Sequence, residues 1–344
     1  MESFRCDYAE GCAPQILEAL QKSNMEQTDG YGCDDHCYHA AKLIKERFAC
    51  QNADVHFLVG GTQCNQIVIS SFLRPWQSVI ACQTGHINVH ETGAIESLGH
   101  KVCTAVSDNG KLNPQLIQQV LQEHESEHMV VPAMVYISNT TEVGTVYTLA
   151  ELQAISGFCR KNGLLLYLDG ARIGSALCSD ACDIQPEDYA KYCDAFYIGG
   201  TKNGALFGEA VVLVNDVLKP NFRHMIKQQG ALLAKGRLLG IQFEELFKDD
   251  LFFKLAEHEN KMAAMLAQGL QKLGVTFLFP AQSNQLFISL PQQVANQMAT
   301  TYGFEWWGPK QNGMAGLRLV TSFATPSQRV QAFLNDLKIL LQAK

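Results

Sequence analysis

Six short apolar runs, separated by helical patterns, limit the fold of this chain more than any other feature of its sequence. The runs are rich in β-branched residues and cover 55–61, 78–82, 129–138, 164–170, 195–200 and 209–215. They are apolar throughout rather than alternating, as strands buried on both faces are. Helical patterns lie between them, at 63–73, 88–98, 113–124 and 148–161. We therefore predict an α/β fold with a mainly parallel sheet.

The pattern changes near residue 240. A long helical stretch runs to Gly274, and short strand candidates follow at 276–279, 285–290 and 316–323, with helices at 291–301 and 326–342. We expect a large domain at 1–240 and a small α+β domain at 241–344. Whether the N-terminal segment packs on the small domain stays open.

Charge and hydropathy exclude several classes of partner. The net charge is -7, so the chain has no basic field that would attract nucleic acid. No apolar run approaches the ~18 residues that a membrane-spanning helix needs. The first residues, "MESFRCDYAEGC", lack the basic and apolar regions of a secretory signal. We expect a cytoplasmic protein with neither nucleic acid nor membrane as a partner.

Twelve cysteines are spread over the chain before residue 194. A chain of 344 residues can bury a core without a disulfide framework, so we interpret them as reduced thiols. One cluster, "CDDHCYH", brings together Cys33, His36, Cys37 and His39. It contains no CxxC pair, and its spacing is too tight for one tetrahedron of ligands, so we expect no metal site.

Polar residues follow several strand candidates at the point where each strand should end. In "YLDGARIGSA", residues 167–176, Asp169 and Arg172 are three apart on a glycine turn. In "FYIGGTKNGA", a glycine pair precedes Lys202. Ligands of open α/β sheets bind at the carboxyl ends of the strands. We therefore expect a site there, with the candidates Gly60, Gly61, Thr62, His86, Asn139, Asp169, Arg172 and Lys202.

Each of these candidates has two interpretations. Asp169 either caps the next helix or holds the ring proton of a pyridinium. Lys202 is either a surface lysine or a Schiff-base lysine whose pKa is lowered by desolvation. The segment 60–65 is either a bare strand-to-helix junction or a phosphate site at a helix N-terminus. His86 is either structural or lies flat over a cofactor ring. His86 and His90 could also bind a metal ion as a pair, but the sequence offers no third ligand for it.

Taken together, the motifs resemble a known enzyme family. "DGAR", the lysine downstream of it, "GGTQ", "GH-x4-E-x-G" and "DGYG" are similar to those of the low-specificity L-threonine aldolase and β-eliminating lyase group. The resemblance runs from "FRCDYAEG" to "GLRLVTSF", nearly the whole chain. It implies the aspartate-aminotransferase fold (fold type I), the cofactor pyridoxal 5'-phosphate (PLP), and a homo-oligomer, a dimer or tetramer, with shared active sites.

The resemblance also implies a reaction. It favours retro-aldol cleavage of β-hydroxy-α-amino acids, such as threonine or allo-threonine, to glycine and an aldehyde. The alternative is β-elimination or transamination of another small amino acid. A non-catalytic binding protein on the same scaffold is a further rival, because a fold does not determine a function.

Roles follow for individual residues by the same resemblance. The cofactor would be held by Lys202 through a Schiff base, by Asp169 at the pyridine nitrogen, by His86 stacked on the ring, and by Gly61 and Thr62 at the phosphate, with Arg172 beside it. The substrate carboxylate would be bound by Arg172 and Arg318, with Cys6 nearby. Tyr31 of "DGYG" would reach into the site of a neighbouring subunit.

The chain departs from the family pattern at three places. Cys6 replaces a serine, and Thr141 replaces a second active-site histidine. Ala234 replaces a phosphate-binding arginine, so we expect Lys227 or Lys235 of the neighbouring chain, and favour Lys235, to supply the missing charge.

The loss of the second histidine raises the question of which group takes the proton of the β-hydroxyl. Thr141 cannot accept a proton at neutral pH. Glu142 is adjacent, but neighbours on an extended segment point to opposite faces, which argues against both entering the site. His86 is then expected to act as the base, through a bound water, because imidazole side chains in general titrate near neutral pH.

Overall fold

A seven-stranded sheet forms the larger part of the protein. The computed structural model describes residues 2–342, and the sheet has the strand order β2-β8-β7-β6-β5-β3-β4. The strands are β2 (Asp54–Leu58), β3 (Gln77–Cys82), β4 (Val102–Ala105), β5 (Val131–Ser138), β6 (Leu165–Asp169), β7 (Ala195–Gly199) and β8 (Glu209–Leu213). In the described chain only β8 runs antiparallel to its neighbours, which confirms the predicted mainly parallel sheet.

All six predicted runs form strands, and alternate residues of a strand face two separate cores. Val135 and Ile137 of β5 pack in one core, whereas Met134 and Tyr136 pack in the other. Strands β7 and β8 are buried along their whole length. The edge strand β4 escapes prediction because it is only four residues long.

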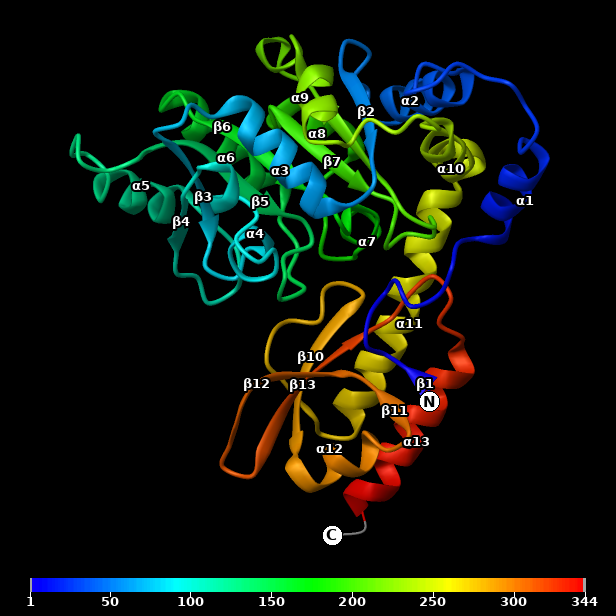
Figure 1. Ribbon diagram of the computed structural model, residues 1–344. Helices are drawn as coiled ribbons and strands as arrows, with labels where there is room; N and C mark the ends of the chain where they lie inside the picture. Colours follow the sequence, from blue (N-terminus) through cyan, green and yellow to red (C-terminus); the bar gives the residue numbers. More distant parts are fainter. Residues whose placement is uncertain (1, 343–344) are drawn as a thin grey trace.

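Helices cover both faces of this sheet (Figure 1). They are α1 (Pro14–Lys22), α2 (Asp35–Arg47), α3 (Gly61–Phe72), α4 (His86–Val89), α5 (Pro114–Gln122), α6 (Leu149–Lys161), α7 (Ile173–Leu177), α8 (Pro186–Tyr192), α9 (Phe222–Gln228) and α10 (Arg237–Phe247). The predicted helix at 88–98 is wrong. Thr92 and Gly93 take φ values of 53° and 72°, so the chain turns there, and only a short 3-10 turn follows at Glu96–Leu98.

The smaller part is an antiparallel sheet covered by helices. Its strand order is β12-β13-β10-β9. The strands are β9 (Thr276–Phe277), β10 (Gln285–Pro291), β12 (Glu305–Gln311) and β13 (Met314–Val320), and the helices are α11 (Leu251–Lys272), α12 (Gln292–Met298) and α13 (Ser327–Gln342). Figure 1 shows α11 running from the larger part into the smaller one. Among residues 2–342, no helix has both the length and the apolar character needed to cross a bilayer.

The N-terminal segment belongs to this smaller part. Strand β1 (Glu2–Ser3) pairs in parallel with β11 (Tyr302–Gly303). The N–H of Phe4 donates to the carbonyl of Gly303 at 2.7 Å, and the N–H of Val320 donates to the carbonyl of Phe4 at 2.8 Å. The Phe4 ring is fully buried among the helices and strands of the smaller part. Residues 2–4 are therefore bound by backbone hydrogen bonds to residues 302–303 and 320 of the smaller part.

The long helical stretch after residue 240 is interrupted. Asp249 and Asp250 take φ values of 53° and 57°, which separates α10 from α11. The sequence-based boundary between residues 240 and 241 would fall inside α10, which packs against α1 and α2 of the larger part. We therefore propose that the two domains meet a few residues later, at the interruption.

Two histidines of the "CDDHCYH" cluster join α2 to α10. Glu244 accepts hydrogen bonds from His36 Nδ1 and His39 Nδ1, both at 2.7 Å, and His36 Nε2 lies 2.9 Å from Glu26 Oε2. Within the described residues, no group of three His, Cys, Asp or Glu side chains is arranged to hold a metal ion. The histidines here connect helices through carboxylates.

This connection should make the stability of the protein depend on pH. Burial acts to lower the pKa of His36, but the hydrogen bonds to Glu244 and Glu26 outweigh it and raise the pKa. The stabilisation is therefore complete below the unfolded value of about 6.5 and is lost as the pH rises through the raised folded value. Urea unfolding measured from about pH 6 to 9 should show this decline, and Glu244→Gln should flatten it. Equal slopes in the two proteins would contradict the assignment.

Candidate functional site

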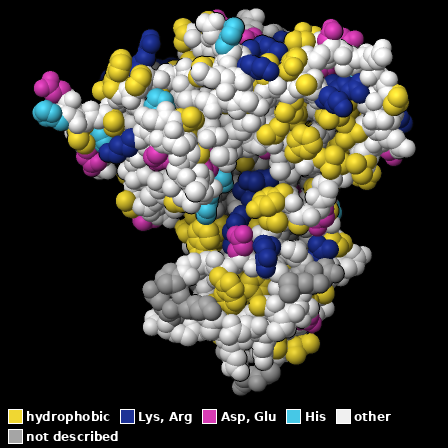
Figure 2. Space-filling view, viewed as in Figure 1, with side chains coloured by type: hydrophobic (Ala, Val, Ile, Leu, Met, Phe, Trp, Pro, Cys, Tyr) yellow, Lys and Arg dark blue, Asp and Glu magenta, His cyan; other side chains and the backbone are white. Residues whose placement is uncertain are grey.

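One cavity lies at the carboxyl edge of the seven-stranded sheet. Seven of the eight strand-end candidates line it: Gly60, Gly61, Thr62, His86, Asp169, Arg172 and Lys202. The eighth, Asn139, is not among the lining residues, and its Nδ2 donates to the Tyr189 hydroxyl at 2.9 Å. The seven lining candidates come from four places in the sheet order, since they follow β2, β3, β6 and β7. Figure 2 shows Lys, Arg and His side chains gathered between the larger and smaller parts of the molecule. The candidates that the sequence places at separate strand ends therefore lie together in one cavity.

Asp169 ends β6 and is held by several donors. Tyr197 Oη donates to Oδ1 at 2.5 Å, and Tyr136 Oη donates to Oδ2 at 2.6 Å. Asn65 Nδ2 donates to Oδ2 at 3.3 Å, and the N–H of Ala171 donates to Oδ1 at 3.0 Å. The side chain does not cap the next helix, because α7 begins four residues later, at Ile173, and has no side-chain cap. These donors fix the orientation of a buried carboxylate that is 3% exposed.

His86 begins α4 and is oriented by a buried glutamate. His86 Nδ1 lies 2.7 Å from Glu91 Oε1, which also accepts from Asn65 Nδ2 at 2.7 Å. The Tyr167 hydroxyl donates to Asn65 Oδ1 at 3.0 Å, so the amide nitrogen of Asn65 faces the two carboxylates. The hydrogen on Nδ1 is thereby directed at Glu91, which leaves Nε2 for the cavity. Asn65 links this pair to Asp169.

Lys202 follows β7 in a tight turn. Burial, and next the charge of Arg172, lower the pKa of its amine, against opposing contributions from Asp7, Asp169 and Glu209. Among the described residues, no hydrogen bond or ion pair holds its ammonium group. A lysine in this state is suited to act as a nucleophile.

Glu209 is a site residue that sequence reasoning missed. It begins β8, and because β8 is antiparallel, its first residue lies at the same edge as the ends of the other strands. Glu209 Oε2 accepts from the N–H of Gly200 at 2.9 Å. Burial raises the pKa of Glu209 to about 7, although Thr201 and Lys202 act to lower it. Sequence reasoning missed Glu209 because it begins the apolar run at 209–215. A hydrophobic pattern does not show the direction of a strand, so it does not show that the first residue of this strand lies at the edge that carries the site.

The N-terminus of α3 faces the cavity with free backbone donors. Gly60 and Gly61 open the helix, and no side chain caps it. A Cβ on Gly61 would come within 2.8 Å of the Tyr197 hydroxyl, so a larger residue would not fit. Exposed N–H groups and the helix dipole together favour an anion such as a phosphate.

Arg172 forms a buried ion pair. Its Nε lies 2.6 Å from Asp7 Oδ2 and its Nη2 lies 3.1 Å from Asp7 Oδ1. Asn284 Nδ2 also donates to Asp7 Oδ2, at 2.8 Å. Burial acts to raise the pKa of Asp7, but the charges of Arg172 and Lys202 hold it below the ordinary value. Asp7 occupies one edge of the guanidinium, and the remaining N–H groups of Arg172 stay on the cavity side.

Arg318 is placed beside the site rather than in its lining. Its Nη1 lies 2.5 Å from Glu305 Oε2, and its Nε donates to Gln285 Oε1 at 3.1 Å. Burial, and next the charge of Arg172, lower its pKa. The charges of the Arg172 and Arg318 guanidinium groups therefore interact. Two guanidinium groups that bind the same anion must also lie near each other.

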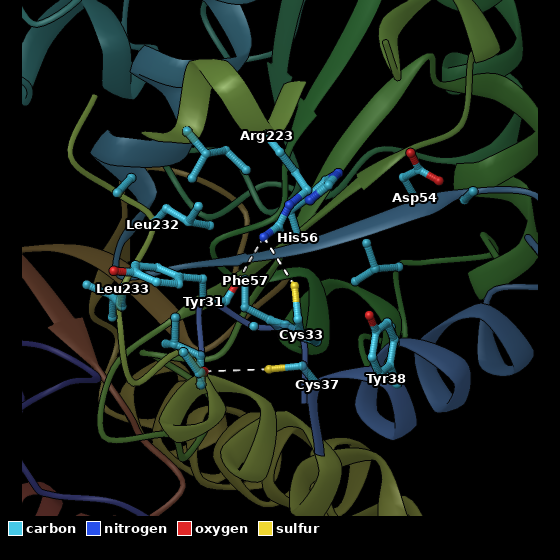
Figure 3. Close-up of a pocket in the computed structure, with 18 of the residues that line it drawn as sticks. Tyr31, Cys33, Cys37, Tyr38, Asp54, His56, Phe57, Arg223, Leu232 and Leu233 are labelled. Atoms are coloured by element: carbon cyan, nitrogen blue, oxygen red, sulfur yellow. Dashed lines mark hydrogen bonds between the residues drawn. The ribbon is translucent and has the colours of Figure 1, made fainter. Parts of the chain in front are cut away.

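Further predicted residues, besides Arg318, lie outside the lining of this cavity. Cys6 and Lys235 are not among its lining residues, and Tyr31 lines a second cavity with Cys33 and Arg223 (Figure 3). In Figure 3 an Arg223 nitrogen donates to the carbonyl of Tyr31, at 3.0 Å. The N–H of Tyr31 donates to the carbonyl of Ala234 at 3.1 Å. Tyr31 is 44% exposed, so it remains accessible to a neighbouring chain.

The expectation that Glu142 stays out of the site is wrong. The segment after β5 is a turn, in which the N–H of Thr141 donates to the carbonyl of Thr145 at 2.9 Å. Thr141 Oγ1 lies 2.7 Å from Thr145 Oγ1, away from the cavity. The two neighbours do point in opposite directions, and the one directed into the cavity is Glu142.

The whole chain is similar to proteins of one family. Residues 3–293 match the family model described as "Beta-eliminating lyase". A low specificity L-threonine aldolase of a Pseudomonas species is 32% identical over 345 residues, which cover 99% of each chain.

Solved structures give the same result for the fold. The threonine aldolase of Leishmania major is 51% identical, with a TM-score of 0.98 over 99% of this chain and 100% of that one. A Thermus thermophilus aspartate aminotransferase mutant is 13% identical, with a TM-score of 0.74 over 98% of this chain and 91% of that one. The predicted aspartate-aminotransferase-like fold is confirmed, and the chain belongs to the beta-eliminating lyase family.

Proposed function

We propose that the protein is a PLP-dependent lyase that cleaves β-hydroxy-α-amino acids, such as threonine or allo-threonine, to glycine and an aldehyde. The observation that carries the proposal is the pairing, in one cavity, of a lysine of lowered pKa with a buried carboxylate that four donors hold. The threonine aldolases that resemble the whole chain support the choice of substrate.

The residues of the cavity fit the cofactor. The α3 N-terminus offers donors for its phosphate, Asp169 offers a fixed carboxylate for its ring nitrogen, and Lys202 offers an amine for its aldehyde. His86 would stack on the ring, with its tilt set by Glu91. When bound, PLP withdraws the electron pair of the bond that breaks at Cα.

The substrate would be held through its carboxylate. Arg172 keeps N–H groups on the cavity side, and Arg318 lies near it, so both can serve one carboxylate in the bidentate way that guanidinium favours. The Asp7 partner keeps the Arg172 fork in place before the substrate arrives. Cys6 and Tyr31 stay proposed substrate neighbours, Tyr31 across a subunit contact.

The products of the purified protein test this function. Incubation with L-threonine, L-allo-threonine, L-serine and L-cysteine should yield glycine and acetaldehyde from the first two. Pyruvate from serine or cysteine would favour β-elimination instead, and a keto acid formed only with an amino acceptor would favour transamination. Failure to act on any amino acid while binding PLP would favour a non-catalytic role.

A homo-oligomer with shared sites, located in the cytoplasm, is part of the proposal. The twelve cysteines are unpaired in the structure, in keeping with a reducing compartment. Lys235 lies next to Ala234, where the family has an arginine, and the ammonium of Lys227 lies 4.8 Å from the Tyr31 ring.

We expect sedimentation to give a dimer or tetramer. Lys235→Ala should weaken PLP binding about 10-fold or more, the scale of one lost charged hydrogen bond, because the phosphate would lose a cation of the neighbouring chain. Lys227→Ala is the matched comparison. A fully active monomer would remove the idea of shared sites.

A further inference from the structure

Glu142 presents a carboxyl group to the cavity that the proposed function has not used. Its Oε1 accepts from the N–H of His86 at 3.0 Å and from Ser138 Oγ at 2.7 Å. These two donors come from different elements, since His86 begins α4 and Ser138 ends β5. Among the described residues, both hydrogen bonds from other residues go to Oε1, and the further donor near this carboxyl is the backbone N–H of Glu142 itself. One oxygen of the carboxyl is therefore anchored and the other is available.

The turn that carries Glu142 keeps this arrangement rigid. The N–H of Gly144 donates to the carbonyl of Thr141 at 3.0 Å, and Gly144 has a φ of 79°, where glycine is favoured. Thr145 Oγ1 donates to the carbonyl of Asn109 at 2.7 Å, which connects the turn to the loop between β4 and α5. Glu142 is thus held toward the cavity by both its own contacts and those of its neighbours.

The surroundings of Glu142 favour proton exchange. Burial, and next the charge of Asp169, raise its pKa, while hydrogen bonding to Ser138 and the charge of His86 oppose the rise. The charge of Glu142 also contributes to the raised pKa of the buried Tyr136 and Tyr147 hydroxyls. A carboxyl whose pKa is shifted toward neutrality is a better proton acceptor and donor at cellular pH than an exposed one.

We propose that Glu142 accepts the proton of the substrate β-hydroxyl when the Cα–Cβ bond breaks. This assignment rests on the proposed aldolase function. The O–H bond gives its proton to Glu142 and its electron pair to the new C=O of the aldehyde. The electron pair of the Cα–Cβ bond stays on the Cα side, and a proton later added there completes glycine. One proton leaves the hydroxyl and one reaches Cα, so the step balances.

Other groups in the cavity are already committed. Glu209 Oε2 accepts from the N–H of Gly200, and Glu209 lies next to Lys202. His86 Nδ1 is taken by Glu91, and the ring of His86 is assigned to the cofactor. Glu142 therefore replaces His86 as the expected base, and His86 keeps the positioning role.

Glu142→Gln is the variant that isolates the base. Glutamine keeps an acceptor for Ser138 and for the His86 N–H but cannot take a proton at neutral pH. Threonine cleavage should fall by about 10²-fold or more, the usual scale of a lost general base. Exchange of the glycine Cα hydrogen with solvent should stay close to wild type, because that step involves no β-hydroxyl. Glu142→Asp should recover part of the cleavage.

Two measurements that do not depend on turnover complete the test. Titration of the apoprotein with PLP, followed by fluorescence, should give the same affinity in wild type and Glu142→Gln. Unfolding of the apoprotein should show that Glu142 contributes stability that is complete below the unfolded pKa of about 4.3 and is lost as the pH rises through the raised folded value. The glutamine variant should lack this loss.

The outcomes separate the two proposals. If the wild-type protein cleaves no β-hydroxy amino acid, the aldolase function fails. If it does, and Glu142→Gln cleaves threonine as fast, the Glu142 assignment fails alone. Equal losses of cleavage, exchange and PLP affinity in Glu142→Gln would show a structural role and overturn it too. His86→Asn is the matched comparison: it should lower cleavage and exchange together, and a loss of cleavage alone would return the base to His86.

Discussion

Lys202→Ala should remove nearly all threonine cleavage. The amine would be lost both as the covalent anchor of the cofactor and as the base that exchanges protons at Cα. Loss of a positioned acid or base alone costs about 10²–10⁴-fold, so the fall should be at least of that size. Because no hydrogen bond or ion pair of the described residues holds the Lys202 ammonium, its removal should leave the fold intact.

Borohydride reduction and peptide mapping check the role of Lys202 directly. In the wild-type protein the pyridoxyl group should be found on the peptide that contains Lys202, and in Lys202→Ala on none. Lys191→Ala, which removes an exposed lysine of α8, the helix before β7, should leave labelling and activity unchanged. Labelling of a different lysine in the wild-type protein would contradict the assignment of Lys202 as the residue that binds the cofactor.

Asp169→Asn should give the second largest loss. The amide keeps the size of the carboxylate but removes the negative charge that would hold a protonated ring nitrogen. Loss of one preorganised electrostatic contact at a reacting centre costs about 10²–10³-fold in kcat. The amide would also turn an N–H₂ group toward a donor, since both oxygens of Asp169 now accept hydrogen bonds from tyrosines.

Tyr197→Phe is the comparison for Asp169→Asn. It removes one donor but leaves the carboxylate with Tyr136, Asn65 and the Ala171 N–H, so activity should fall much less. Steady-state kinetics and the absorption spectrum of bound PLP report the two effects separately. An Asp169→Asn variant with a wild-type kcat would mean that the carboxylate only organises the surrounding tyrosines.

Part of this site was predictable because it follows from strand ends. Asp169 and Lys202 each interrupt an apolar run at a glycine, and parallel strands bring such ends together. The direction of a strand is not written in its composition, so Glu209 looked like the interior of one more apolar run. The contact of Asn65 with both Asp169 and Glu91 depends on side chains from three separate segments. Only the folded chain shows such a contact.

Other misses have local causes. The four-residue strand β4 is too short to give a pattern, and the turn at Thr92 and Gly93 ends a helix that apolar spacing alone predicts. The alternation argument rightly separated Thr141 from Glu142, but it could not say which of them faces the cavity. Tyr31 and Lys235 lie away from the cavity of their own chain, so their roles depend on a neighbour.

The pairing of β1 with β11 has a consequence for the order in which the protein is completed during synthesis. Glu2 and Ser3 find their strand partners some three hundred residues later, at Tyr302 and Gly303. Asp7 lies four residues after the end of this strand and accepts from Asn284 as well as from Arg172. Glu2 and Ser3 are therefore synthesised long before their partners and are among the last of these residues to reach their native places, since contacts of such long sequence separation form slowly. A nascent chain that ends before Asn284 and β11 can already build most of the parallel sheet. In such a chain Asp7 is not yet in its final place, so the guanidinium of Arg172 is not yet held in its final orientation. Completion of the substrate site is in this way tied to the synthesis of Asn284 and of β11.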